Sequence, residues 1–215
     1  MRLTGAVANR CHTPLPTVGL VLLETSCVLC RQPGAAVCPP CAASLRPAPP
    51  LARPLGIDSC VALLHYDDAR QLVTALKNGD RRDVLGWLAA RLASEVDPPP
   101  GAVVGWAPTS AHRRRTRGYD QAELLARALA RRWRRPCQPL LRRGRGPAQA
   151  GQPAAARRHN PVFSAARRVP AHVILVDDVI TTGATMTAAA RALRAAGATG
   201  LMAVAAARAP APGAR

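Results

Sequence analysis

The stretch from Val173 to Thr185 holds the residues of this chain that are best suited to chemistry. Two adjacent carboxylates, Asp177 and Asp178, precede a threonine-rich turn that contains Gly183. Hydroxyl groups, backbone N–H groups and the positive end of a helix dipole together suit a phosphate group. Glycine has no Cβ, so the backbone at Gly183 can approach an anion closely. The stretch therefore predicts an anion site with two carboxylates beside it.

The two carboxylates restrict which ligand fits this turn. They repel a simple anion unless the ligand also brings hydroxyl groups or a metal ion. A phosphate joined to a vicinal diol, such as a ribose 5-phosphate unit, meets both demands. The turn lacks the Gly-Lys-Ser/Thr ending of a Walker A loop. The alternative is a buried strand that ends in a helix-capping Asp-Asp turn, but the Thr-Thr-Gly-Ala-Thr run after it favours a ligand site.

This stretch closely resembles the phosphoribosyl pyrophosphate (PRPP) motif of type I phosphoribosyltransferases. We expect Asp177 and Asp178 to engage the ribose hydroxyls and to be catalytic residues. We expect the 5-phosphate to bind along the turn, at Thr181, Thr182, Gly183, Ala184 and Thr185. Mg²⁺, which prefers oxygen ligands, would bridge ribose and pyrophosphate oxygens.

A second segment that suits phosphate groups lies at His112–Tyr119. It follows an apolar strand predicted at Ala102–Trp106 and precedes a helix. The segment has four arginines that could hold a pyrophosphate: Arg113, Arg114, Arg115 and Arg117. We expect Arg113 to bind PRPP, and Arg115 and Arg117 to stabilise the departing pyrophosphate. The alternative is a solvated loop, because charged runs often face water.

Four cysteines near the N-terminal end form two Cys-x-x-Cys pairs: Cys27, Cys30, Cys38 and Cys41. Each pair forms a tight turn that points two thiolates inward, and two such turns supply the tetrahedral sulfur shell that Zn²⁺ prefers. A structural zinc site is favoured over a redox pair or free thiols, because a redox motif needs no second pair. Cys11, Cys60 and Cys137 are interpreted as ordinary thiols.

Composition narrows the class of protein. The formal charge is +18, all but one of the 30 basic residues are arginine, and many of them lie between Arg113 and Arg168. This block would attract polyanions, or it would simply form a solvated basic face. Aromatic residues make up 3%, too few for a base-stacking surface. Without an apolar run of about 20 residues we expect no membrane span, and clustered cysteines indicate a reducing compartment, so we expect a cytoplasmic protein.

Apolar runs and helical periodicity predict an α/β fold with a parallel sheet flanked by helices. The expected strands are Ser59–His65, Ala102–Trp106, Val173–Val176 and Leu201–Ala206. The expected helices lie from about Asp68 to Asn78, Arg81 to Val96, Asp120 to Arg132 and Thr185 to Ala196. Lys77 is interpreted as a solvated lysine at a helix end and His65 as a packing residue. The segment Leu140–Val162 is either a mobile loop that closes over a ligand or a disordered basic loop.

The order of these motifs resembles the ComF family, also called competence protein F-like or GntX-type. The motifs are the two cysteine pairs, Ala75–Gly79, Arg115–Ala126 and the Asp-Asp-Val-Ile-Thr-Thr-Gly-Ala-Thr run. The resemblance implies an N-terminal zinc ribbon fused to a type I phosphoribosyltransferase-like fold. It divides the chain into an N-terminal extension (1–26), a zinc-ribbon-like module with a Pro-rich linker (27–55), a phosphoribosyltransferase-like domain (56–208) and a tail (209–215). Asp120 replaces the Asn usual in this family and adds a negative charge beside the anion site, unless it caps a helix.

Two functions follow as hypotheses. The first is a PRPP- and Mg²⁺-binding protein of nucleoside metabolism that transfers or hydrolyses the phosphoribosyl group, a pentosyltransferase. The second is a non-catalytic adaptor in competence and DNA uptake, which binds single-stranded DNA or recombination proteins and uses PRPP as a regulatory ligand. The acceptor substrate stays open, as does the choice between a monomer and a homodimer.

Overall fold

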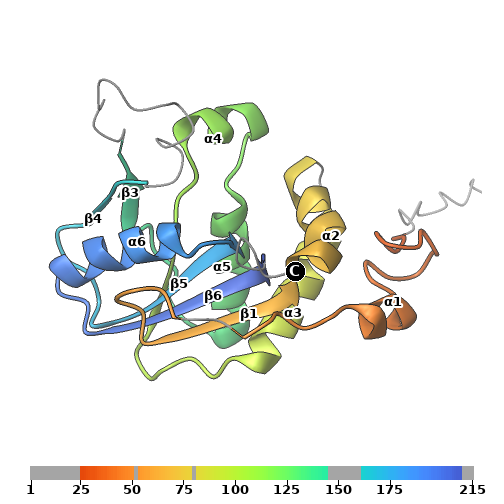
Figure 1. Ribbon diagram of the computed structural model, residues 1–215, viewed down its shortest axis with the longest axis horizontal. Coiled ribbons are helices and arrows are strands. Elements are labelled where there is room, and N and C mark those ends of the chain that lie inside the picture. Colours follow the sequence, from red (N-terminus) through yellow and green to blue (C-terminus); the bar gives the residue numbers. More distant parts are fainter. Residues whose placement is uncertain (1–24, 51–52, 79–80, 145–160, 210–215) are drawn as a thin grey trace, which may run out of the picture.

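The computed structural model describes residues 25–50, 53–78, 81–144 and 161–209 (Figure 1). Several predictions fall on other residues and lie outside the described part of the chain. These are the predictions for most of the N-terminal extension, for Cys11, for residues 145–160 of the segment Leu140–Val162 and for nearly all of the tail.

The centre of the fold is a four-stranded parallel sheet. Its strands are β1 (Ser59–His65), β6 (Gly200–Arg208), β5 (His172–Ile180) and β2 (Val103–Trp106), in that spatial order. Both edges of β5 are paired, with β6 and β2, and packed elements bury both of its faces, which explains why its apolar run does not alternate with polar residues. The predicted α/β fold with a parallel sheet and flanking helices is confirmed.

Each face of the sheet has its own core. On β5, Ile174 and Val176 pack into one core with α2 (Tyr66–Asn78), α3 (Arg82–Glu95) and α5 (Gln121–Trp133). Val173 and Leu175 point the other way, because successive strand residues face opposite sides. They pack with α6 (Ala184–Ala195) and a small hairpin formed by β3 (Leu141–Arg143) and β4 (Phe163–Ala165). Figure 1 shows α6 in front of the sheet and α3 and α5 behind it.

The Pro-rich segment after the cysteines lies along the outer edge of β1. The Ala48 N–H donates to Leu63 O at 3.1 Å, and the His65 N–H donates to Arg46 O at 3.0 Å. The segment therefore covers an edge that would otherwise expose unpaired backbone groups. The first part of the predicted linker, as far as Pro50, therefore packs on the sheet. Residues 51–52 are not described.

Three local expectations were wrong. Asp68 does not begin a helix, because α2 starts at Tyr66 directly after β1. The Asp68 carboxylate instead accepts hydrogen bonds from the backbone and guanidinium of Arg46, at 2.7 to 2.9 Å. The strand expected to end at Val176 continues to Ile180, because β6 runs beside it over this length and Ile180 pairs with Arg208. The arginine-rich segment was expected to be a loop, but most of it forms a helix, α4 (Ala111–Arg117).

In the described ranges, no helix combines the length and apolar character needed to cross a membrane.

Candidate functional site

A polar cavity opens where β5 extends past its neighbour. β2 ends at Trp106, which pairs with Val176, and the Ala107 N–H still donates to Val176 O at 2.9 Å. Beyond this point the chain turns away into α4, whereas β5 continues with Asp177 and Asp178. Ligands of open parallel sheets bind at the carboxyl ends of the strands, where this cavity of about 310 Å³ lies. It is lined by Tyr66, Lys77, Ala107, Thr109, Arg113, Arg117, Asp120, Gln121, Ala122, Arg143, Asp177, Asp178, Val179, Thr181 and Thr185.

The two adjacent carboxylates have different surroundings. Burial, and next the charge of Asp178, raise the pKa of Asp177 well above its ordinary value. Asp178 lines the same cavity, and its Oδ2 is 3.4 Å from Lys77 Nζ. Lys77 was expected to be a solvated helix-end residue, and this expectation was wrong, because its side chain lines the cavity and forms an ion pair.

The threonine-rich turn forms one end of the cavity. Gly183 adopts φ +76°, a left-handed conformation, and a Cβ there would lie 3.3 Å from Pro54 Cγ. The turn leads into α6, whose first N–H groups have no acceptor within the helix. Thr181 and Thr185 line the cavity, and Gly183 lines a smaller adjoining cavity of about 20 Å³. Thr182 instead accepts a hydrogen bond from the Ala184 N–H at 3.4 Å, so it shapes the turn.

The arginines of α4 divide between two sides of the helix. Ser110 caps α4 by accepting from the Arg113 N–H, and Gly118 ends it at φ +79°. Residues four apart share a helix face, so Arg113 and Arg117 both line the cavity. Arg115 is exposed and is not among the described residues that line it.

Asp120 joins the α4 side of the cavity to the sheet. One carboxylate oxygen accepts from the N–H groups of Ala122 and Glu123, at 3.1 and 3.5 Å, and so caps α5. The other oxygen accepts from the Thr109 N–H at 2.8 Å. The side chain is buried, and burial raises its pKa. The Asp120 carboxylate therefore serves as a helix cap, which is the role that the sequence left open for it.

Besides Lys77, sequence reasoning missed further side chains of the cavity. Arg143 reaches it from β3, with its guanidinium 5.6 Å from the centre of the Phe163 ring and 3.4 Å from Pro108 O. Burial, and next the charge of Arg113, lower the pKa of Arg143. Gln121 and Tyr66 also line the cavity. No local pattern identifies these residues, because the elements that carry them meet only in the fold.

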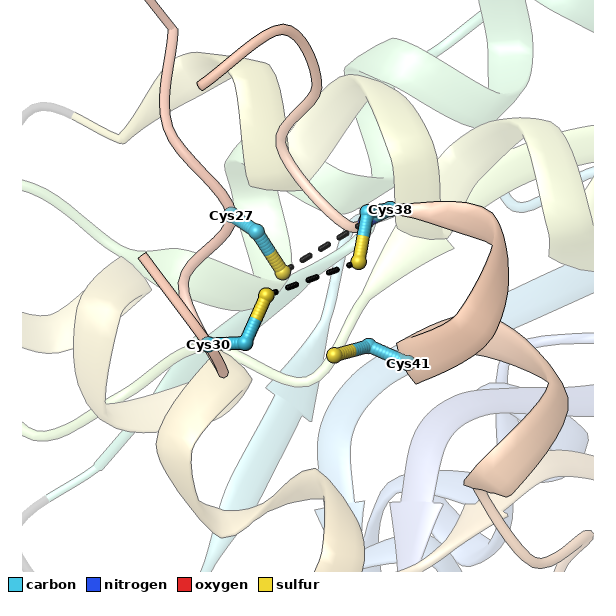
Figure 2. A group of neighbouring side chains, drawn as sticks. All are labelled: Cys27, Cys30, Cys38 and Cys41. Carbon is cyan, nitrogen blue, oxygen red and sulfur yellow. Dashed lines mark hydrogen bonds between the residues drawn. The ribbon is translucent and has the colours of Figure 1, made fainter. Parts of the chain in front are cut away.

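The four predicted zinc ligands lie together (Figure 2). The sulfur atoms of Cys27, Cys30, Cys38 and Cys41 are all within 4.8 Å of one another, so they are placed to bind a metal ion such as zinc. Figure 2 shows the side chains converging from a turn and from the start of α1 (Pro39–Ser44). Burial opposes ionisation of Cys27, but donation from the backbone N–H groups of Cys30 and Cys38 lowers its pKa to about 6.

The cysteine module is fixed to the domain at the start of α3. Arg81 Nη2 donates to Ser26 O at 2.5 Å and to Asp83 at 2.9 Å. Val37, between the two cysteine pairs, is buried in the core that contains α2 and α3. Four thiolates around one metal leave no open coordination position, which suits a structural rather than a catalytic metal.

Comparison with known proteins finds a family match over part of the chain. Residues 123–213, less than half of the chain, match the family described as phosphoribosyl transferase domain. Among solved structures, the chain is similar to a purine phosphoribosyltransferase from Pyrococcus horikoshii Ot3, with 16% identity and a TM-score of 0.33, over 73% of this chain and 95% of that one. No curated protein matches. The matched segment contains most of α5 and all of β5, the carboxylate pair, the threonine-rich turn and α6.

Proposed function

We propose that this protein binds PRPP together with Mg²⁺ in the cavity at the end of β5, as a ComF-like member of the phosphoribosyltransferases. One observation carries the proposal. Two carboxylates, a helix N-terminus with threonines, and a pair of arginines surround a single cavity of about 310 Å³. These three groups match the diol, the 5-phosphate and the diphosphate of PRPP.

Each part of the ligand has a partner in this arrangement. The ribose hydroxyls donate to Asp177 and Asp178, and the 5-phosphate accepts from the N-terminal N–H groups of α6 and from Thr181 and Thr185. Arg113 and Arg117 attract the diphosphate from the opposite wall. The carboxylate oxygens of Asp177 and Asp178 are hard ligands that suit Mg²⁺. When bound, the ion supplies positive charge to the diphosphate.

The supported chemistry is displacement of pyrophosphate from C1 of the ribose. The C1–O bond breaks, pyrophosphate leaves with the electron pair, and an acceptor or water forms the new bond to C1 and releases its proton to solvent. Arg113 and Arg117 stabilise the negative charge that gathers on the leaving group, which is an electrostatic form of catalysis. Arg115, exposed on α4, contributes only to the long-range field.

The proposal is tested by calorimetric titration of the protein with PRPP, with and without Mg²⁺. We expect Mg²⁺-dependent binding that is lost in the double variant Asp177→Ala/Asp178→Ala. The matched control is Asp67→Ala/Asp97→Ala, which removes two exposed carboxylates and should bind like the unchanged protein. Absent Mg²⁺-dependent binding, or equal affinity in both double variants, would overturn the proposal.

A second candidate function rests on the outer side of α4. His112, Arg114 and Arg115 are exposed there, so the helix presents positive charge to solvent as well as to the cavity. This surface supports binding of a single-stranded nucleic acid through its phosphates. Such binding would fall steeply with salt and would persist in the Asp177→Ala/Asp178→Ala variant. Loss of nucleic-acid binding in that variant would instead place both ligands in one cavity.

A further inference from the structure

Lysine is almost absent from this chain. Of 30 basic residues, 29 are arginine and one is lysine, Lys77. Guanidinium and ammonium groups both carry one positive charge, but they differ in shape. Arginine is a planar fork, whereas lysine is a compact point charge with three donors. The one lysine of the chain lies in the wall of the candidate site.

The surroundings of Lys77 fix where its ammonium can act. Its Nζ lies 3.4 Å from Asp178 Oδ2, and both side chains are about three-quarters buried, with exposed fractions of 26% and 22%. The end of α2 is anchored, because Tyr119 donates its hydroxyl hydrogen to Leu76 O at 2.7 Å. The backbone of Lys77 is therefore held against the α4–α5 junction.

We propose that Lys77 is a ligand-binding residue that also positions Asp178. One of its donors holds the Asp178 carboxylate in place for the ribose hydroxyls. The donors that remain face the cavity and bind an anionic oxygen of the diphosphate. An arginine at this position would keep the positive charge, but its longer side chain and planar guanidinium would occupy part of the cavity that the diphosphate fills. This inference rests on the proposed binding of PRPP.

The unusual composition supplies a direct test. An amine-directed reagent such as dilute acetic anhydride finds only two amines in this sequence, Lys77 and the N-terminal amine. We expect PRPP with Mg²⁺ to slow acetylation of Lys77 by at least about tenfold, measured by mass spectrometry of the Lys77 peptide. The N-terminal amine is the internal control and should react at an unchanged rate. Equal rates at Lys77 with and without bound PRPP would overturn the inference.

Substitutions separate positioning from folding. We expect Lys77→Met to weaken PRPP binding by at least about tenfold and Lys77→Arg to restore part of it. Arg70→Met, which removes one exposed charge from the same helix, should bind like the unchanged protein. Circular dichroism and thermal melting of each variant exclude misfolding as the cause.

The outcomes distinguish this inference from the proposed function. If the unchanged protein binds PRPP and Lys77→Met binds it equally well, the role of Lys77 is wrong and the proposed function stands. If the unchanged protein does not bind PRPP, both are overturned.

Discussion

The cysteine cluster and the polar cavity are built in opposite ways. The cluster takes all four of its side chains from a short stretch, Cys27 to Cys41, and all of them have the same chemistry. The cavity takes its side chains from α2, α4, α5, β3, β5 and the start of α6, and these differ in charge and type. A local site can be found in the sequence by spacing alone, whereas a distributed site exists only once the sheet has formed.

The two sites also differ in whether they leave room for a further ligand. Four sulfur atoms within 4.8 Å of one another would complete the shell of a zinc ion and exclude other ligands. The cavity instead brings cationic and anionic side chains around open space. The first arrangement suits stability, and the second suits binding of a ligand that carries both phosphates and hydroxyls. Four predictions test how far this separation holds, in order of decreasing expected effect.

Removal of one cysteine should abolish the metal centre and spare the cavity. We expect Cys38→Ser to lower the zinc content of the purified protein from about one ion per chain to nearly none, because three ligands bind far more weakly. Elemental analysis and thermal melting measure this change. Cys137→Ser, which lies outside the cluster, is the control. A large loss of PRPP affinity in Cys38→Ser would show that the two sites are coupled.

Asp120, the buried cap of α5, should contribute more to stability than any other acidic residue of the cavity. Asp120→Ala leaves the Thr109 and Ala122 N–H groups without their acceptor, so we expect a loss of about 2 kcal/mol in the free energy of unfolding. Urea denaturation measures it. Asp120→Asn keeps an acceptor oxygen and avoids burying a charge, and should retain most of the stability. Equal losses in both variants would contradict the capping role.

Asp177 should reduce stability at neutral pH. Its folded pKa is raised by burial and by the charge of Asp178, so ionisation opposes folding. The favourable contribution of the protonated acid is complete below its unfolded pKa of about 4 and is lost as pH rises through the folded pKa. We expect Asp177→Asn to raise the free energy of unfolding at pH 7 relative to the unchanged protein, and to leave it nearly unchanged near pH 4. Denaturation at both pH values tests the sign, and a gain that is the same at both would contradict it.

The last prediction concerns the arginines of α4, and its change at Arg115 is the smallest expected effect. Arg115→Ala should change PRPP affinity by less than about threefold, whereas Arg117→Ala should weaken it by at least about tenfold, since only Arg117 lines the cavity. Titration calorimetry compares the two. Equal weakening would mean that the helix acts through its total charge rather than through its inner face.

Much of the fold followed from local pattern. The apolar run at Val173–Val176 and the spacing of leucines in α3 are each sufficient to specify an element. Boundaries were harder to predict, because they depend on neighbours. β5 continues to Ile180 only because β6 extends beside it. Asp68 is of a residue type that often caps helices, yet its carboxylate binds Arg46, which lies 22 residues earlier in the chain.

The sequence by itself determined the cysteine pairs, the carboxylate pair and the threonine-rich turn, because each depends on residues a few positions apart. The tertiary structure decided which arginines line the cavity and brought Lys77, Gln121 and Arg143 into its wall. Those side chains come from elements that meet only when both faces of the sheet are packed. The spacing of residues along the chain does not predict these contacts, because they form only when the apolar residues of the two cores are buried.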